Sequence, residues 1–302
     1  MKKLAPLFIV IAAALWGLDG IVLRPSLYSL PVPLVVFVEH LLAFAVMLPF
    51  LIVEFKELKK LKKADWGSFI WIAVFGGAIG TMAITKALFY VDFVNLSIVI
   101  LLQKLQPVFA IFLAWLVLKE KLPKKFFLWA LMAMLGGYFV TFGTNLPVLT
   151  GNKTFIAALF SLLAAFSFGS GTVFGKKALR AINFRVGTYL RFGITSLIMF
   201  LVVLATGNLG AVSQITAHQL ATFLIIVFTT GGLAIFLYYW GLKRVTASVS
   251  TICELAFPLT AILLEYLLRD NVLDWAQWLG AAVLAYGIYQ VSSLKEGRTV
   301  EI

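Results

Sequence analysis

Charged side chains occur inside long apolar segments of this chain, where charges are rare. Each would cost about 2.5–3.5 kcal/mol if it faced lipid at the middle of a bilayer. Together they would exceed the roughly 5–15 kcal/mol that stabilises a typical folded protein. They must therefore face water, a solute or one another. The residues concerned are Asp19, Glu39, Lys86, Lys104, Arg191, Glu254 and Glu265.

Two of the apolar segments carry the polar groups best suited to hold a solute. In segment 246–268, small and polar residues recur at spacings of three and four, which places them on one stripe of a helix. The stripe comprises Ala247, Ser250, Thr251, Glu254, Pro258, Ala261 and Glu265. In segment 94–118, Gln103 and Gln106 share a face, and Lys104 follows Gln103 about 100° around the helix. These groups line a solute cavity or make hydrogen bonds between helices.

Each of these segments also contains a proline. Proline has no backbone N–H, so Pro107 leaves the carbonyl of Gln103 without its helical donor, and Pro258 does the same for Glu254. We therefore expect both helices to be kinked near the middle of the membrane.

Composition indicates that a bilayer surrounds these elements. The chain is 62% hydrophobic and 13% charged, with a mean hydropathy of +1.01, whereas soluble domains are roughly 45–50% apolar. Segments of about 20 apolar residues can cross the membrane as helices. We expect an all-α membrane protein with ten transmembrane helices and no soluble domain. The expected helices lie near 4–24, 32–53, 66–90, 94–118, 124–142, 154–175, 184–205, 218–242, 246–268 and 274–293.

The basic residues are divided unevenly between the loops. If the amino terminus is cytoplasmic, the inside loops hold the lysine-rich runs 56–63 and 119–125, whereas Arg24, Lys153 and Arg269 lie outside. This positive-inside bias predicts a multi-pass protein of the inner (plasma) membrane with both termini in the cytoplasm. The same bias explains the net charge of +12, so the expected partner is the lipid bilayer and not nucleic acid.

The second half of the chain repeats the first at a shift of about 151 residues. The aligned pairs include Gly80 with Gly231, Gln103 with Glu254 and Pro107 with Pro258. Because each half has an odd number of predicted helices, the two halves must cross the bilayer in opposite directions. We expect residues 1–147 and 148–302 to form two inverted five-helix repeats around a central cavity, which is typical of transporters.

At the outer side, the predicted helices bring four polar residues to a similar depth. Asp19, Glu39, His40 and Lys86 come from the first three helices and can form an ion-pair cluster. This cluster is either a fixed salt bridge or an extracellular gate that breaks and reforms during transport. The sequence leaves both interpretations open.

Toward the cytoplasmic side, Arg191 can balance Glu254 or hold an anionic group of a solute. The aromatic run 238–240 is typical of an interfacial belt, with a platform for a solute as the alternative. Trp16, one turn before Asp19, lies deeper in its helix and is the better candidate for the cavity wall.

The residue types argue against other classes of function. With Cys253 as the single cysteine and two histidines, we expect no disulfide, no metal site and no cofactor. A membrane-embedded enzyme needs a nucleophile beside a base, but His40 and Cys253 lie in different halves without evident partners. We expect no catalytic residues, and a monomer or homodimer.

The pattern resembles a known family. The opening Leu-Trp-Gly at 15–17, the stretch LQKLQPVF at 102–109 and the Leu-Lys-Glu at 118–120 resemble the EamA-type branch of the drug/metabolite transporter superfamily. The resemblance covers almost the whole chain. It implies a basket-shaped helical fold with a central cavity, and export or exchange of small metabolites such as amino acids.

We therefore predict a secondary transporter that works by alternating access. Gln103, Lys104 and Glu254 would be polar groups of the cavity, and the two proline kinks would be its bending points. A cavity with both signs of charge suits a zwitterion such as an amino acid. The alternative is proton-coupled uptake, in which Glu254 or Asp19 carries the proton.

Overall fold

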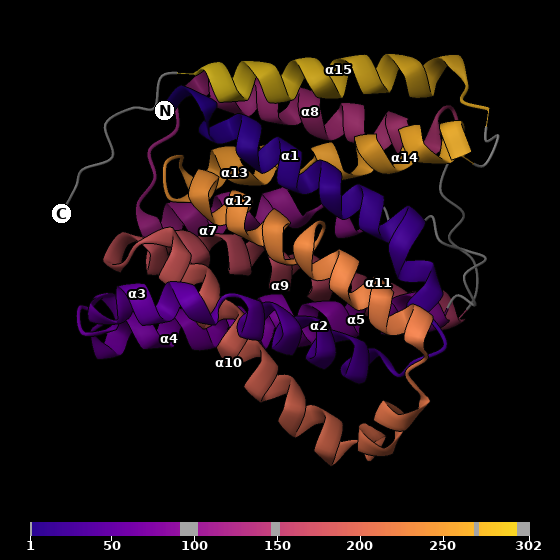
Figure 1. Cartoon of the computed structure of the whole chain (residues 1–302). Coiled ribbons are helices and arrows are strands. Elements are labelled where there is room, and N and C mark those ends of the chain that lie inside the picture. Colours follow the sequence, from indigo (N-terminus) through magenta and orange to yellow (C-terminus); the bar gives the residue numbers. More distant parts are fainter. Residues whose placement is uncertain (1, 91–101, 146–151, 269–271, 295–302) are drawn as a thin grey trace.

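The structure is a computed structural model that describes residues 2–90, 102–145, 152–268 and 272–294. Within these ranges every regular element is a helix (Figure 1). The α-helices are α1 (Ala5–Leu18), α2 (Val32–Val46), α3 (Leu48–Leu58), α4 (Lys63–Trp71), α5 (Gly80–Tyr90), α7 (Gln106–Leu118), α8 (Lys124–Phe142), α9 (Asn152–Ala181), α10 (Phe184–Ala205), α11 (Ala217–Phe228), α12 (Gly232–Leu242), α13 (Ala247–Cys253), α14 (Ala256–Leu268) and α15 (Trp275–Ser293).

Seven stretches of the described chain are long and apolar enough to cross a membrane, and an eighth is added if α2 and α3 form one span. The seven are Ala5–Leu27, Lys63–Ala87, Lys124–Phe142, Phe155–Ala181, Phe184–Ala205, Ala217–Leu242 and Ala247–Leu268. The prediction of an all-helical, multi-pass membrane protein is therefore confirmed. The number ten stays a prediction, since residues 94–101 of the expected fourth helix lie outside the described residues.

The structure differs from the sequence prediction in the second helix. The expected span 32–53 is divided between α2 and α3, whose axes differ by 77°. Met47 lies at the bend with φ −88° and ψ 0°, and Pro49 is the second residue of α3. Proline cannot donate the hydrogen bond that would continue α2 through this point, which explains the bend.

The two prolines that were expected to kink their helices, Pro107 and Pro258, also coincide with breaks. Lys104 and Leu105 form a turn immediately before α7, three and two residues before Pro107. Glu254 and Leu255 separate α13 from α14, again just before a proline, Pro258. Each break exposes backbone and side-chain polar groups in the middle of an apolar segment.

Other segments also depart from α-geometry, including the π-helix η4 (Ile72–Ile79) between α4 and α5. After α1 the chain continues as a π-helix, η2 (Asp19–Leu23), and then as a 3-10 turn, η3 (Arg24–Leu27). Between α11 and α12, Thr229 and Gly231 have non-helical backbone angles on either side of Thr230. The segments η2 and η3 and the break between α11 and α12 bring polar side chains close together, as described below.

The helices pack in a regular pattern (Figure 1). Helix α1 lies against α12 and α14, whereas α9 lies against α5 and α7. Helix α2 packs on α10, and α8 runs alongside α15. Glycines permit the last contact, since Gly136 faces the backbone of Leu284 and Gly280 faces that of Val140.

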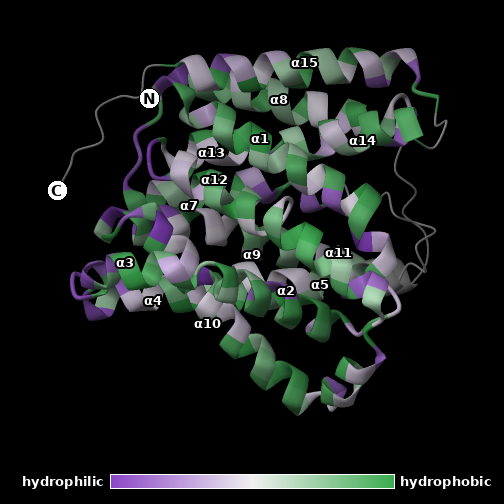
Figure 2. Cartoon of the chain, viewed as in Figure 1, coloured by the Kyte–Doolittle hydropathy of each residue, from purple (hydrophilic) through white to green (hydrophobic). Residues whose placement is uncertain are grey.

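Several predicted inside loops meet at the end of the molecule that carries the amino terminus (Figures 1 and 2). Arg185 Nε lies 2.6 Å from Glu54 Oε1, and the backbone N–H of Asn183 donates to Glu57 Oε2 at 3.3 Å. Lys60 also donates to the Glu57 carboxylate, which lowers the pKa of Glu57. Lys243 Nζ donates to a backbone carbonyl of α9 at 3.0 Å. We call this the basic end.

Candidate solute-binding site

Glu254 is the centre of a hydrogen-bond network built from four helices. Its Oε2 accepts from Gln106 Nε2 at 2.9 Å, and its Oε1 accepts from the Tyr238 hydroxyl at 2.8 Å and Ser250 Oγ at 3.1 Å. Thr172 Oγ1 lies 3.2 Å from Oε1 and also 3.0 Å from the Tyr238 hydroxyl. We call these five residues the central network.

Local structure explains how the network forms. Ser250 lies one helical turn before Glu254, so both side chains project from the same face of the α13 segment. Gln106 is the first residue of α7 and directly follows the turn formed by Lys104 and Leu105. Both halves of the central Gln106–Glu254 pair are therefore positioned by helix breaks, and the carboxylate can accept several donors at once.

Aromatic side chains lie beside the network. The rings of Trp16 and Tyr238 have centroids 5.2 Å apart and are tilted by 58°, and Tyr239 follows at 5.8 Å from Tyr238. The guanidinium of Arg191 lies 5.5 Å from the Tyr239 ring, and its Nη1 donates to the Tyr239 hydroxyl at 3.4 Å. The site therefore combines a carboxylate, hydroxyls, an amide, flat rings and a nearby cation.

The predicted cavity residues are found at different distances from this centre. Gln106, Ser250 and Glu254 form the network, and Trp16 contacts it through Tyr238. Among the described residues, Arg191 reaches the network through Tyr239, and its buried Nε has no hydrogen-bond partner there.

Gln103 and Lys104 lie just before α7 and are half-buried. Within the described chain, neither makes a hydrogen bond to the central network. Their role in binding a solute stays a prediction.

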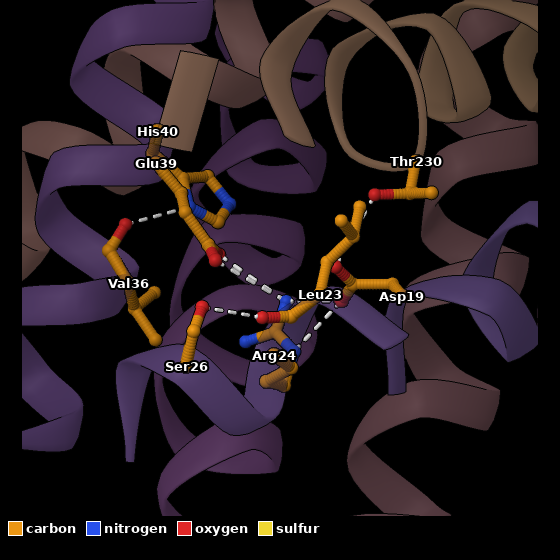
Figure 3. Close-up of polar contacts among 8 residues, drawn as sticks. All are labelled: Asp19, Leu23, Arg24, Ser26, Val36, Glu39, His40 and Thr230. Atoms are coloured by element: carbon orange, nitrogen blue, oxygen red, sulfur yellow. Dashed lines mark hydrogen bonds and ion pairs between the residues drawn. The ribbon is translucent and has the colours of Figure 1, made fainter. Parts of the chain in front are cut away.

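A second polar cluster surrounds Arg24 (Figure 3). Arg24 Nε donates to Asp19 Oδ2 at 2.7 Å, and its Nη2 lies 2.6 Å from the same oxygen and 3.3 Å from Glu39 Oε1. Thr230 Oγ1 donates to Asp19 Oδ1 at 3.2 Å. We call these four residues the Arg24 cluster, which joins η2 and η3 to α2 and to the break before α12.

This cluster differs in composition from the expected one. Asp19 and Glu39 lie together as predicted from their depth, but the cation between them is Arg24, whereas Lys86 is exposed on α5. His40 Nδ1 donates to the Val36 carbonyl at 2.8 Å, and its ring contacts Phe192 edge-on at 5.4 Å. Arg24 belonged to a loop in the sequence prediction, but η2 and η3 turn it back toward the helices.

Sequence reasoning did not place Thr172 and Tyr238 in the site. Thr172 comes from the small-residue run of α9, where no periodic polar stripe distinguished it. Tyr238 belonged to the expected interfacial belt, yet it is 3% exposed and bonded to Glu254. A buried tyrosine in an apolar helix needs a partner for its hydroxyl. This requirement could have indicated from the sequence that Tyr238 lies near another polar side chain.

A bundle of membrane-crossing helices around a largely buried polar network is typical of membrane transporters. The EamA-like transporter family matches residues 3–142 and, a second time, residues 155–293. The chain belongs to this family, and its function is therefore transport of a small molecule and not catalysis.

Individual relatives cover nearly the whole chain. The protein named riboflavin transporter ImpX, from Fusobacterium nucleatum, is 48% identical over 290 residues, which are 95% of this chain and 97% of that protein. The uncharacterized transporter YwfM of Bacillus subtilis is 27% identical over 292 residues, covering 95% and 93%. A crystal structure of another protein matches with a TM-score of 0.73 at 17% identity and covers 100% and 99%, which shows a shared fold.

Proposed function

We propose that this protein carries riboflavin across the membrane. The observation that supports the proposal is the 48% identity to a riboflavin transporter over nearly the full length of both proteins. The expected amino acid substrate came from the family resemblance and from the mixed charges of the site, which are less specific.

The chemistry of the site suits this solute. Riboflavin combines a flat aromatic heterocycle, whose edge carries carbonyl and N–H groups, with a chain of hydroxyls. Flat rings stack on aromatic side chains, and Trp16 and Tyr238 offer two adjacent rings. Glu254 accepts hydrogen bonds from hydroxyl or N–H groups, and the Gln106 amide both donates and accepts. A bound riboflavin would thus replace hydrogen bonds that Tyr238, Ser250 and Gln106 now make to Glu254.

The proposed mechanism is alternating access between two inverted halves, residues 1–147 and 148–302. Two observations support it. The family matches the chain twice, once in each half. The packing is also reciprocal, because α1 contacts α12 and α14 of the second half, while α9 contacts α5 and α7 of the first. Such exchanged contacts are expected when two similar halves are related by a two-fold axis.

The proposed direction of transport is uptake from outside. The proposed orientation has both termini in the cytoplasm. The lysine-rich loops at the basic end support this orientation, since positively charged loops favour the cytoplasmic side. Export or exchange of an amino acid is the second candidate, because Glu254 and Arg191 offer opposite charges near one another.

Solute exchange in liposomes tests the proposal. Purified protein is reconstituted into vesicles loaded with unlabelled riboflavin, and entry of labelled riboflavin is followed. We expect counterflow above that of empty vesicles, blocked by excess riboflavin and not by amino acids. Exchange of an amino acid without riboflavin counterflow would instead support the second candidate.

A matched pair of tryptophan variants tests the location of the site. Trp16→Ala removes a ring next to Tyr238 and should lower riboflavin counterflow at least tenfold. Trp278→Ala removes a 45% exposed ring on α15 and should leave counterflow near the unsubstituted level. Equal effects of the two substitutions would contradict a site at Trp16.

A further inference from the structure

The charges of the Arg24 cluster do not balance. Asp19 and Glu39 each carry a carboxylate, and Arg24 is the cation that pairs with both. The side chains of Asp19 and Glu39 are 9% and 12% exposed, so their charges are largely removed from water. A buried charge without a full partner is costly. Among the described residues, the cluster is therefore short of one positive charge.

The two carboxylates are held unequally (Figure 3). Asp19 accepts a 2.7 Å hydrogen bond from Arg24 Nε and another from Thr230. Glu39 Oε2 accepts a single long hydrogen bond of 3.4 Å from Arg24, and its buried Oε1, which forms an ion pair with Arg24 Nη2 at 3.3 Å, accepts no hydrogen bond from the described residues. Neutralising Glu39 therefore costs fewer hydrogen bonds than neutralising Asp19. Its Oε1 is the oxygen that can take a proton.

The described elements around Glu39 supply few other cations that could pair with its carboxylate. His40, next to Glu39 on α2, donates to the Val36 carbonyl and faces Phe192 of α10, and no hydrogen bond among the described residues joins it to Glu39. Arg191 of α10 donates to the Tyr239 hydroxyl. Lys86 of α5 and His218 of α11 are exposed. The other segments packed on α2 at this level, η4 (Ile72–Ile79) and η5 (Asn208–Gln214), contain no titratable side chain.

We propose that Glu39 is a proton-binding site that couples the movement of H⁺ to that of the solute, an inference that rests on the proposed riboflavin transport. The proton adds to Glu39 Oε1, the carboxylate becomes a neutral carboxylic acid, and no bond to another group is made or broken. Arg24 stays paired with Asp19, so the cluster becomes neutral as a whole.

The position of the cluster explains how proton binding acts on transport. Arg24 and Asp19 belong to the π and 3-10 segments after α1, Thr230 lies in the break between α11 and α12, and Glu39 lies on the regular helix α2. Neutral Glu39 loses the ionic attraction to Arg24 that holds α2 to the end of α1. Protonation of Glu39 therefore favours the separation of α2 from the end of α1. It shifts the population toward the state in which the protein is open at the end where the Arg24 cluster lies.

The test measures proton movement and riboflavin exchange in the same vesicles. Vesicles contain a trapped pH-sensitive dye, and riboflavin is added outside. The unsubstituted protein should acidify the lumen when riboflavin enters, and an inward acid gradient should increase uptake. Glu39→Gln should lower both responses at least tenfold while riboflavin counterflow, which needs no net proton movement, changes less than threefold.

The control is Glu57→Gln at the basic end, which should retain both proton responses. If the unsubstituted protein shows no riboflavin counterflow, the proposed function fails. If it shows counterflow but no acidification, or if Glu39→Gln still moves protons, the coupling inference is wrong and the function stands.

A second variant guards against loss of folding. Glu39→Asp keeps a titratable group but moves it away from Arg24, so uptake driven by the acid gradient should persist with a shifted pH dependence. A pH dependence identical to that of the unsubstituted protein would overturn the assignment of the proton to Glu39.

Discussion

Glu254 shows how a charged residue is accommodated within apolar helices. Its two oxygens receive hydrogen bonds from Gln106, Thr172, Tyr238 and Ser250, which come from four helices. Leaving a buried donor unpaired costs about 1–3 kcal/mol. A solute that enters must therefore offer replacement partners, and this requirement selects for solutes rich in hydroxyl, carbonyl or N–H groups.

The Tyr238 hydroxyl provides a sharp test of this idea. Tyr238→Phe keeps the ring beside Trp16 but removes the 2.8 Å hydrogen bond to Glu254. We expect the riboflavin concentration for half-maximal exchange to rise roughly tenfold, equivalent to about 1.4 kcal/mol, because the network is no longer held in place.

The same substitution at an exposed tyrosine controls for general effects. Tyr289 on α15 is 65% exposed, so Tyr289→Phe should leave riboflavin exchange unchanged. If Tyr238→Phe behaves like Tyr289→Phe in concentration-dependent exchange, the central network does not contact the solute.

The sequence anticipated much of this site and missed parts for identifiable reasons. The spacing of Ser250 and Glu254 on one helix follows from helical periodicity, and their contact is seen in the structure. Tyr238 and Thr172 join the site only through packing between distant helices, which periodicity within one helix does not report. The solute-binding roles of all these residues stay predictions.

At the scale of elements, glycines determine how closely α8 and α15 approach. A Cβ placed on Gly136 would lie 2.5 Å from the backbone nitrogen of Leu284, whereas one on Gly137 would meet nothing within 4 Å. These two neighbours therefore differ sharply in what they tolerate, although the sequence alone treats them alike.

This difference can be measured by thermal unfolding in detergent. Gly136→Ala should force α8 and α15 apart and destabilise the protein by about 1–3 kcal/mol, seen as a lower Tm. Gly137→Ala should keep the Tm or raise it slightly, because alanine favours the helix more than glycine does. Equal Tm values for the two variants would show that this contact does not form.

Helix breaks were predicted only where proline causes them. The breaks before Pro107 and Pro258 follow from a missing backbone donor, which is visible in the sequence. The π-helix Asp19–Leu23 has no such local cause, and it is this segment that brings Arg24 to Glu39. The ion-pair partner was therefore assigned to Lys86 from depth alone, since depth estimates assume regular helices.

At the scale of the whole molecule, the orientation in the membrane can be read with single cysteines. The native Cys253 is fully buried, so it should contribute little background. Ser213 in η5 and Lys60 at the basic end are both exposed. A membrane-impermeant maleimide should label Ser213→Cys in intact cells and Lys60→Cys only after permeabilisation. The reverse pattern would place the basic end outside.

The overall class followed from composition and from the repeated halves, which depend on averages over many residues. Hydropathy and length were sufficient to predict a helical membrane protein, and the structure confirms this class. The bend between α2 and α3 was not predicted, although Pro49 lies beside it, because the expected span 32–53 was drawn from apolar content, which continues unchanged through Met47 and Pro49. Averages over a window do not detect a change in direction.

That bend has a consequence for the surrounding lipid. The fifteen residues of α2 are about 22 Å long at 1.5 Å per residue, short of the roughly 30 Å hydrocarbon core. Turned by 77°, α3 presents Ile52, Val53 and Phe55, which are 70%, 81% and 55% exposed. Such a surface suits the boundary between headgroups and acyl chains. We therefore expect the bilayer beside α2 to be locally thinned by hydrophobic mismatch, so that the length of the lipid acyl chains affects the free energy of moving this helix.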